Sequence, residues 1–190
     1  MNNPVPSPGL RASRLKLLLI VAVFMAPIIA AGVLTLSGWQ PDAKGNGLPI
    51  SPQRNFEAEH VRIATASGGD WPWRASEPKW TLLVLAGPGC ATHCLDVLTR
   101  IAWSRQTLSQ NAKRLRLVYV GEPPAGKARE AMDNYWQVGR DVDGRLSPYQ
   151  PQSPDTVAAL LVESNGTALS LYPAGFDPMG LHKDLQKVIR

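Results

Sequence analysis

Two cysteines, Cys90 and Cys94, are the residues of this 190-residue chain best suited to chemistry, and the sequence contains no others. On a helix, residues four positions apart share one face, and their Cα atoms lie roughly 6 Å apart, within the range that a disulfide tolerates. Such a pair can cycle between a dithiol and a disulfide or hold a soft metal. Residue type and spacing leave both chemistries open.

The sequence around the cysteines predicts how they are positioned. The apolar run Thr81–Ala86 is typical of a buried strand, and Gly87–Gly89 is typical of a turn that opens a helix. Cys90 would then stand at the helix N-terminus, where unpaired amides and the helix dipole favour a thiolate. The glycines would also let a partner's backbone or sulfur come close.

A structural disulfide is the alternative role for Cys90 and Cys94. Closing a loop of five residues constrains the unfolded chain little, so such a bond would add little stability. A strand–helix junction is also where ligand chemistry gathers in open α/β sheets. We therefore expect the two thiols to be functional, and to be the catalytic residues if the protein is an enzyme.

The three histidines are the other candidates for metal binding or proton transfer. His93 lies between the cysteines, where it could lower the pKa of the Cys90 thiol or serve as an additional metal ligand; the alternative is an exposed helix residue. His60 falls in an expected edge strand and His182 in the first turns of the last expected helix. Neither has an evident partner in the sequence, so we expect both at the surface.

The excess of positive charge lies mainly at the N-terminus. Three of the 20 basic residues, Arg11, Arg14 and Lys16, stand in the first sixteen positions, where there is no acidic residue. The remainder carries 17 basic and 15 acidic residues, which is an ordinary surface charge. No stretch interleaves basic and aromatic side chains as a nucleic-acid interface does, so nucleic acid is not an expected partner.

Residues 17–36 contain no charge and would span about 30 Å as a helix, the thickness of the hydrocarbon core of a bilayer. The preceding cations place residues 1–16 in the cytoplasm as a tail. We therefore predict a single-pass protein of a bacterial inner membrane, in contact with the lipid bilayer, whose C-terminal domain is periplasmic. The alternative is a cleaved signal peptide, whose apolar region is usually shorter. Either segment would export the rest of the chain.

The remainder of the chain divides into a linker and a globular domain. Residues 37–55 are rich in Gly, Pro, Asn and Gln and are predicted to be the linker, and residues 56–190 the domain. Trp71 and Trp73 are expected to cover the core of that domain. Its hydrophobic patterns predict strands at 59–65, 81–86, 114–120, 156–163 and 168–172, and helices at 90–110, 126–136 and from 177 onward.

This order of strands and helices, with two cysteines at the tip of the first long strand–helix junction, resembles the α/β thioredoxin-like fold. Three residues separate the cysteines, and this spacing, together with a single N-terminal transmembrane helix, resembles the Sco/SenC family of membrane-tethered copper proteins. The whole chain is similar to small bacterial membrane proteins associated with cytochrome c oxidase assembly. The motifs that carry this similarity are the thiol motif, Ser37–Trp39, Lys79–Leu83 and Asp177–Leu185.

The resemblance implies an accessory factor in assembly of the copper centre of cytochrome c oxidase, with oxidase subunits or other assembly factors as partners. It implies Cu(I) as the metal, Cys90 and Cys94 as ligands, and His93 as a further candidate. Sco proteins add a histidine just before the strand that follows their long loop, whereas residues 153–157 here read Ser-Pro-Asp-Thr-Val. This departure weakens the copper expectation. Thioredoxins place a cis-proline nearby, for which Pro154 is the candidate.

Two other functions fit the same sequence. One is a periplasmic thiol–disulfide oxidoreductase that acts on exported cysteines, and the other is a membrane protein whose thioredoxin-like domain only docks. A fold resemblance does not choose among these roles, because one fold hosts many functions. With the oxidase-assembly role first, we expect an accessory factor rather than a conventional enzyme.

Overall fold

The computed structural model describes residues 8–36, 45–75 and 77–189. The chain divides into two compact units at Lys44, and Gly45 is the first residue of the second unit. The two units are described separately, because each has its own internal contacts.

The first unit contains one long helix, α1, over Pro8–Leu36. Its stretch Arg14–Val33 is apolar and long enough to cross a membrane, and its side chains are exposed to the surroundings. The helix begins ahead of the predicted span of residues 17–36, because it continues into the basic segment that precedes the apolar run. Length and composition fit a membrane anchor or a signal sequence.

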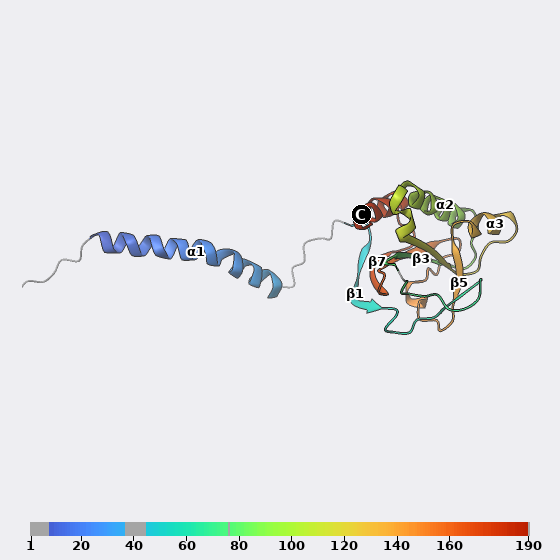
Figure 1. Cartoon of the computed structure of the whole chain (residues 1–190), viewed down its shortest axis with the longest axis horizontal. Coiled ribbons are helices and arrows are strands. Elements are labelled where there is room, and N and C mark those ends of the chain that lie inside the picture. The colour runs from blue at the N-terminus through green and yellow to red at the C-terminus, as the bar shows by residue number, and fades with distance from the viewer. Residues whose placement is uncertain (1–7, 37–44, 76, 190) are drawn as a thin grey trace, which may run out of the picture. The chain divides into compact units, whose positions relative to one another are not determined.

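The second unit is built on one mixed sheet of seven strands (Figure 1). The strands lie in the order β1-β7-β6-β3-β4-β5-β2, with β3, β4 and β5 parallel and every other neighbouring pair antiparallel. The strands are β1 Leu48–Asn55, β2 Ile63–Thr65, β3 Trp80–Ala86, β4 Leu115–Val120, β5 Gln137–Asp141, β6 Val157–Val162 and β7 Thr167–Tyr172.

β3 lies in the middle of this sheet and is buried on both faces, as its unbroken apolar sequence predicts. Leu82 and Val84 pack under the helices, whereas Leu83 and Leu85 pack into the core on the opposite face. β3 therefore joins two hydrophobic cores, and its C-terminal end is held rigidly between them.

Three helices cover the first face of the sheet, with α2 beside α4 in Figure 1. The N-cap of α4 confirms the prediction for the last helix, because the Asp177 side chain accepts hydrogen bonds from the amides of Met179 and Gly180, each at 3.0 Å. The helices are α2 Thr92–Thr107, α3 Lys127–Asp133 and α4 Pro178–Val188, and short 3₁₀ turns span Ser109–Arg114 and Ser147–Tyr149.

The opposite face is covered by irregular chain rather than by a long helix. Phe56, Trp71 and Trp73 pack there with Leu146 against the sheet. The indole of Trp73 is buried and donates a hydrogen bond of 2.7 Å to the carbonyl of Val61. The burial of Trp71 and Trp73 confirms the prediction that they cover the core.

Several sequence-based boundaries are wrong. Residues 48–55, predicted as part of the linker, form β1 and pair with β7, so the folded unit begins at Gly45. β5 was not predicted, because it is short and contains Gly139. The helix expected from residue 90 begins at Thr92, which leaves Cys90 in the preceding turn. Among the described residues the cis peptide bond is Ser51–Pro52, so Pro154 is trans.

A buried carboxylate ties the start of the second unit to α4. Asp184 accepts hydrogen bonds from the amide and the Nδ2 of Asn46, at 2.6 and 3.2 Å, and from the hydroxyl of Tyr172 at 3.2 Å. Burial alone would raise the pKa of Asp184, but hydrogen bonds from Asn46, Lys187 and Tyr172 outweigh it and hold the pKa below its ordinary value. Asp184 is therefore ionised at neutral pH.

Replacing Asp184 with alanine should destabilise the second unit by on the order of 1–3 kcal/mol, because the amide of Asn46 and the hydroxyl of Tyr172 lose their acceptor. Since the folded-state pKa is depressed, this contribution is present above the unfolded-state pKa and is lost as pH falls through the folded-state pKa. Thermal unfolding of the full chain in detergent measures it: the two proteins should differ near neutral pH and converge in acid. Equal stability near neutral pH would contradict this role.

Candidate functional site

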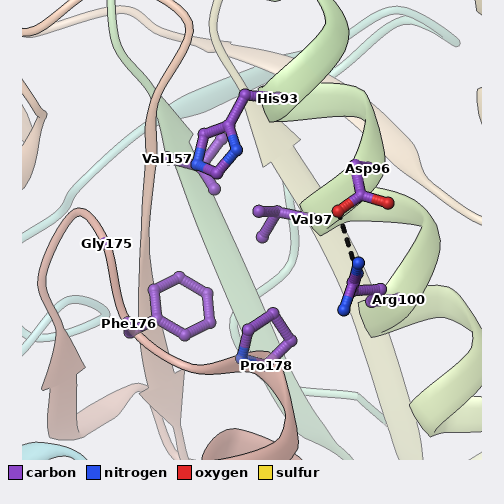
Figure 2. A pocket seen from close by; sticks show the side chains of 8 residues that line it. All are labelled: His93, Asp96, Val97, Arg100, Val157, Gly175, Phe176 and Pro178. Atoms are coloured by element: carbon purple, nitrogen blue, oxygen red, sulfur yellow. Dashed lines mark hydrogen bonds and ion pairs between the residues drawn. The ribbon is translucent and has the colours of Figure 1, made fainter.

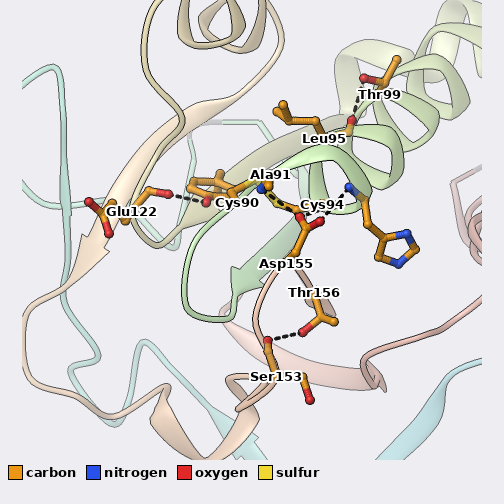
Figure 3. The surroundings of a disulfide bond; sticks show 11 residues. Cys90, Ala91, Cys94, Leu95, Thr99, Glu122, Ser153, Asp155 and Thr156 are labelled. Carbon is orange, nitrogen blue, oxygen red and sulfur yellow. Dashed lines mark hydrogen bonds between the residues drawn. A yellow bond between two sulfur atoms is a disulfide. The ribbon is translucent and has the colours of Figure 1, made fainter.

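Cys90 and Cys94 form a disulfide at the C-terminal end of β3, with their Cα atoms 5.2 Å apart (Figure 3). The predicted proximity is therefore confirmed. Cys94 is completely buried in the first turn of α2, whereas Cys90, in the turn before the helix, is half-buried. Of the two cysteines, Cys90 is therefore the one with surface exposed to solvent.

The turn before the disulfide is packed against a distant part of the same chain. The amide of Gly87 donates to the carbonyl of Thr156 at 2.9 Å, and a Cβ at Gly87 would lie only 2.3 Å from the carbonyl oxygen of Ser153. Gly89 has a positive φ of 69°, which glycine adopts without strain. Gly87 therefore admits the segment 151–156 of the same chain, whereas the space beside Gly89 is open.

Asp155 is the site residue that sequence reasoning missed. Its Oδ1 accepts hydrogen bonds from the amides of Ala91 and Cys94, at 2.8 and 2.9 Å, and its Oδ2 accepts one from the amide of His93 at 3.0 Å (Figure 3). Its own amide faces the carbonyl of Pro88 at 3.2 Å. The turn that carries the disulfide is thus fastened to the chain just before β6.

A sequence signal for this contact exists, although it is weak. Ala91 stands at the N-cap position of α2 and cannot cap the helix with its side chain. A helix without its own cap needs acceptors from elsewhere. Asp155 is a strong capping residue type in the loop before the strand that neighbours β3.

The amides that were expected to favour a Cys90 thiolate have another acceptor, because Asp155 accepts hydrogen bonds from those of Ala91, His93 and Cys94. Hydrogen bonds from the amides of Cys94 and then His93 lower the pKa of Asp155, so it carries its charge at neutral pH. Glu122 also lies in the surroundings of the disulfide, where its backbone carbonyl accepts a hydrogen bond from the hydroxyl of Tyr119 (Figure 3). The turn that carries the disulfide therefore binds one charged carboxylate, that of Asp155.

His93 is exposed, which is the alternative that the sequence left open. Its side chain lines a pocket of about 240 Å³ between α2 and the loop before α4, over an apolar floor of Val97, Val157, Phe176 and Pro178 (Figure 2). This pocket opens beside the turn that carries the disulfide.

The other two histidines do not join the cysteines. His60 is exposed, as expected, but it lies in a turn, because the edge strand predicted at 59–65 begins only at Ile63. His182, also expected at the surface, is half-buried on α4, where it lines a groove with Trp103. In the part of the chain that the structure describes, no three side chains of His, Cys, Asp or Glu are grouped to hold a metal ion. These residues therefore do not fit a three-ligand copper centre.

A protein-family model described as "transmembrane-like, thioredoxin-like, C-terminal domain" matches residues 80–190. The chain belongs to this family. The match runs from β3 through α4 and includes both cysteines and Asp155. A search of curated proteins found no match.

Solved structures with the same fold are distant in sequence. Copper-bound ScoI of Arabidopsis thaliana matches with a TM-score of 0.50 and 14% identity, over 77% of this chain and 99% of that chain. The thioredoxin domain of a thiol–disulfide oxidoreductase from Bacteroides vulgatus matches with a TM-score of 0.50 and 15% identity, over 78% and 100%. Apo Sco1 of Thermus thermophilus matches with a TM-score of 0.49 and 14% identity, over 78% of this chain and 99% of that chain. With the family model, the first two matches show the α/β thioredoxin-like fold, which confirms the predicted fold class.

Gly87→Ala should destabilise the folded unit more than Gly89→Ala does. The first change drives a Cβ against the carbonyl of Ser153 and displaces the segment that carries Asp155, whereas the second meets no neighbour within 4 Å and costs about 1–2 kcal/mol of backbone strain. Thermal unfolding of both variants measures the difference. A Gly87→Ala variant as stable as Gly89→Ala would show that the close approach carries no weight.

Proposed function

We propose that this protein is a membrane-anchored thiol–disulfide redox protein that exchanges its Cys90–Cys94 disulfide with cysteines of exported proteins. One observation carries the proposal: a half-buried sulfur is bonded to a completely buried one at the C-terminal end of a central strand. This asymmetry gives the two sulfurs different roles, with Cys90 open to attack and Cys94 as the leaving sulfur.

The exchange can be written with all atoms and electrons in place. A thiolate of the partner attacks Sγ of Cys90, a mixed disulfide forms, and the Cys90–Cys94 bond breaks with its electron pair on Cys94, which takes up a proton. A second thiolate of the partner attacks the partner's own sulfur in the mixed disulfide. Cys90 then leaves as a thiolate and takes up a proton in its turn. The partner is oxidised to a disulfide, and the pair is reduced to a dithiol.

The pocket lined by His93 supports a binding role for the surface next to the disulfide. Its floor is apolar, and its rim carries Asp96 and Arg100, which are paired with each other at 2.8 Å. An apolar side chain close to a partner's cysteine fits such a floor, and the paired rim adds little net charge. We assign this pocket to the partner segment that flanks the reacting cysteine.

The anchor and the periplasmic location belong to this proposal. Helix α1 supports them through its apolar stretch Arg14–Val33 and the cations that precede it. A periplasm-dependent reporter fused after residue 190 should be active, and the protein should sediment with membranes at its full length. Activity of a cytoplasm-dependent reporter at that position would contradict the topology.

Cys94→Ser should trap a mixed disulfide when the Cys90 thiolate attacks the disulfide of an oxidised partner, which is the reverse of the exchange above. The adduct persists because the serine cannot act as the second sulfur that would release the partner. The matched variant, Cys90→Ser, should trap at least about tenfold less, since Cys94 is completely buried. Non-reducing gels of membranes after acid quenching and alkylation measure both adducts. Equal trapping by the two variants, or none by either, would overturn the redox function.

Assembly of cytochrome c oxidase is a second candidate, supported by the sequence resemblance and by the suitability of two thiolates for Cu(I). In it the reduced pair would hold Cu(I) as cargo or present thiols to an oxidase subunit. Since the described residues offer no third ligand, we derive no copper step.

A third candidate, docking without chemistry, is favoured by the outer surface of α2. Trp103 and Met179 are 66% and 60% exposed, and Trp103 lines two grooves, one shared with α4 and one shared with α3 and Tyr135. Large apolar side chains gathered in this way are typical of interaction surfaces.

One set of strains separates the last two candidates. Cys90→Ser/Cys94→Ser should abolish oxidase activity in membranes if the thiols serve its assembly, whereas Trp103→Ala should do so if docking is the function. Oxidase activity, measured with the variant proteins at wild-type levels, decides between them. Normal activity in both strains would exclude oxidase assembly and leave the thiol–disulfide function.

A further inference from the structure

Backbone amides at the start of α2 donate hydrogen bonds to the carboxylate of Asp155. The amides of Ala91, His93 and Cys94 lie 2.8, 3.0 and 2.9 Å from the carboxylate oxygens of Asp155. Free amides at a helix N-terminus stabilise a thiolate through hydrogen bonds and the helix dipole. A carboxylate bound there removes those donors from a thiolate and places a like charge beside it.

We propose that Asp155 is a positioning residue of the redox pair: it holds the cysteine turn in place and disfavours the thiolate of Cys90, so that the disulfide is the resting form. This inference rests on the redox function proposed above and names the group that regulates it. Asp155 touches no reacting sulfur in any hydrogen bond of the structure; it acts through the backbone of the turn.

The other charged and titratable groups around the turn do not cancel this effect. Glu122, from the loop after β4, faces this side with its backbone carbonyl, which accepts a hydrogen bond of 2.7 Å from the hydroxyl of Tyr119 (Figure 3). Tyr119 is neutral, because burial raises its pKa to about 12. Asp96 is paired with Arg100 on α2, and the exposed His93 lines the pocket on the side of the α4 loop.

The carboxylate that caps α2 comes from a distant segment of the chain and not from the N-cap residue itself. A serine or asparagine at position 91 would cap α2 locally, yet Ala91 stands there and the cap comes from 64 residues away. Asp155 has a positive φ of 55°, a left-handed conformation that aspartate adopts more readily than most non-glycine residues. The fold thus brings this carboxylate to the cysteines from a distant segment, in a conformation that suits its residue type.

The test compares the reactivity of Cys90 in the reduced full chain in detergent micelles. Its alkylation by iodoacetamide, followed by peptide mass, is measured as a function of pH for the wild type and for Asp155→Asn, which removes the charge and keeps the shape. The midpoint of the pH profile should fall by roughly one unit in the variant. At a pH below both midpoints, about tenfold more Cys90 is then thiolate.

Asp177→Asn is the matched control, because it perturbs the N-cap of α4 in the same chemical way and should leave the midpoint at the wild-type value. Asp155→Ser, which still accepts amide hydrogen bonds without a charge, carries the test if Asp155→Asn fails to fold. An unchanged or higher midpoint, or a rate that rises by one factor at every pH, would overturn the inference. Since no partner protein takes part, failure here is separate from failure of the trapping experiment.

Discussion

The hydrogen bonds between the Asp155 carboxylate and the first amides of α2 are the contact on which the site depends. They order the turn that carries the disulfide, cap a helix that has no cap of its own, and fix the loop before β6 against the end of β3. Gly87 makes the contact possible, because any side chain there would push the loop away. Without Asp155 or Gly87, the turn that carries the cysteines would lose its contact with the loop before β6.

Strand order explains why a residue so far along the sequence reaches the cysteines. β6 runs antiparallel beside β3, with Val157 opposite Ala86, so the chain that enters β6 must pass the point where β3 ends. Two residues before Val157 stands Asp155. β3 is buried on both faces and packs into both hydrophobic cores, so its C-terminal end, where the cysteines lie, is held in a fixed position. The position of the site therefore depends on the antiparallel pairing of β6 with β3 as well as on the cysteine motif.

The sequence was sufficient for the elements whose signal is local. The apolar run of β3, the strands β6 and β7 and the start of α4 all fall where residue patterns predict them. What could not be predicted depends on partners far along the chain. β1 is rich in proline and polar residues and is a strand because β7 pairs with it, and β5 contains a glycine required by the close side chain of Ile63. Asp155 belongs to this second class, since the local sequence shows only that Ala91 cannot cap α2 and does not show which distant residue caps it instead.

The junction at Asn46 has a mechanical consequence. If the proposed anchor holds the N-terminal end of the chain, a pull on the folded unit enters it at Gly45. The first hydrogen bonds that would bear this pull are those from Asn46 to Asp184 and to the carbonyl of Gly180. Only behind them comes the edge strand β1, whose bonds to β7 would open one after another. The hydrogen bonds to the buried carboxylate of Asp184 would therefore break before the pairing of β1 with β7 does. These bonds lie at α4, on segments other than those that hold the disulfide.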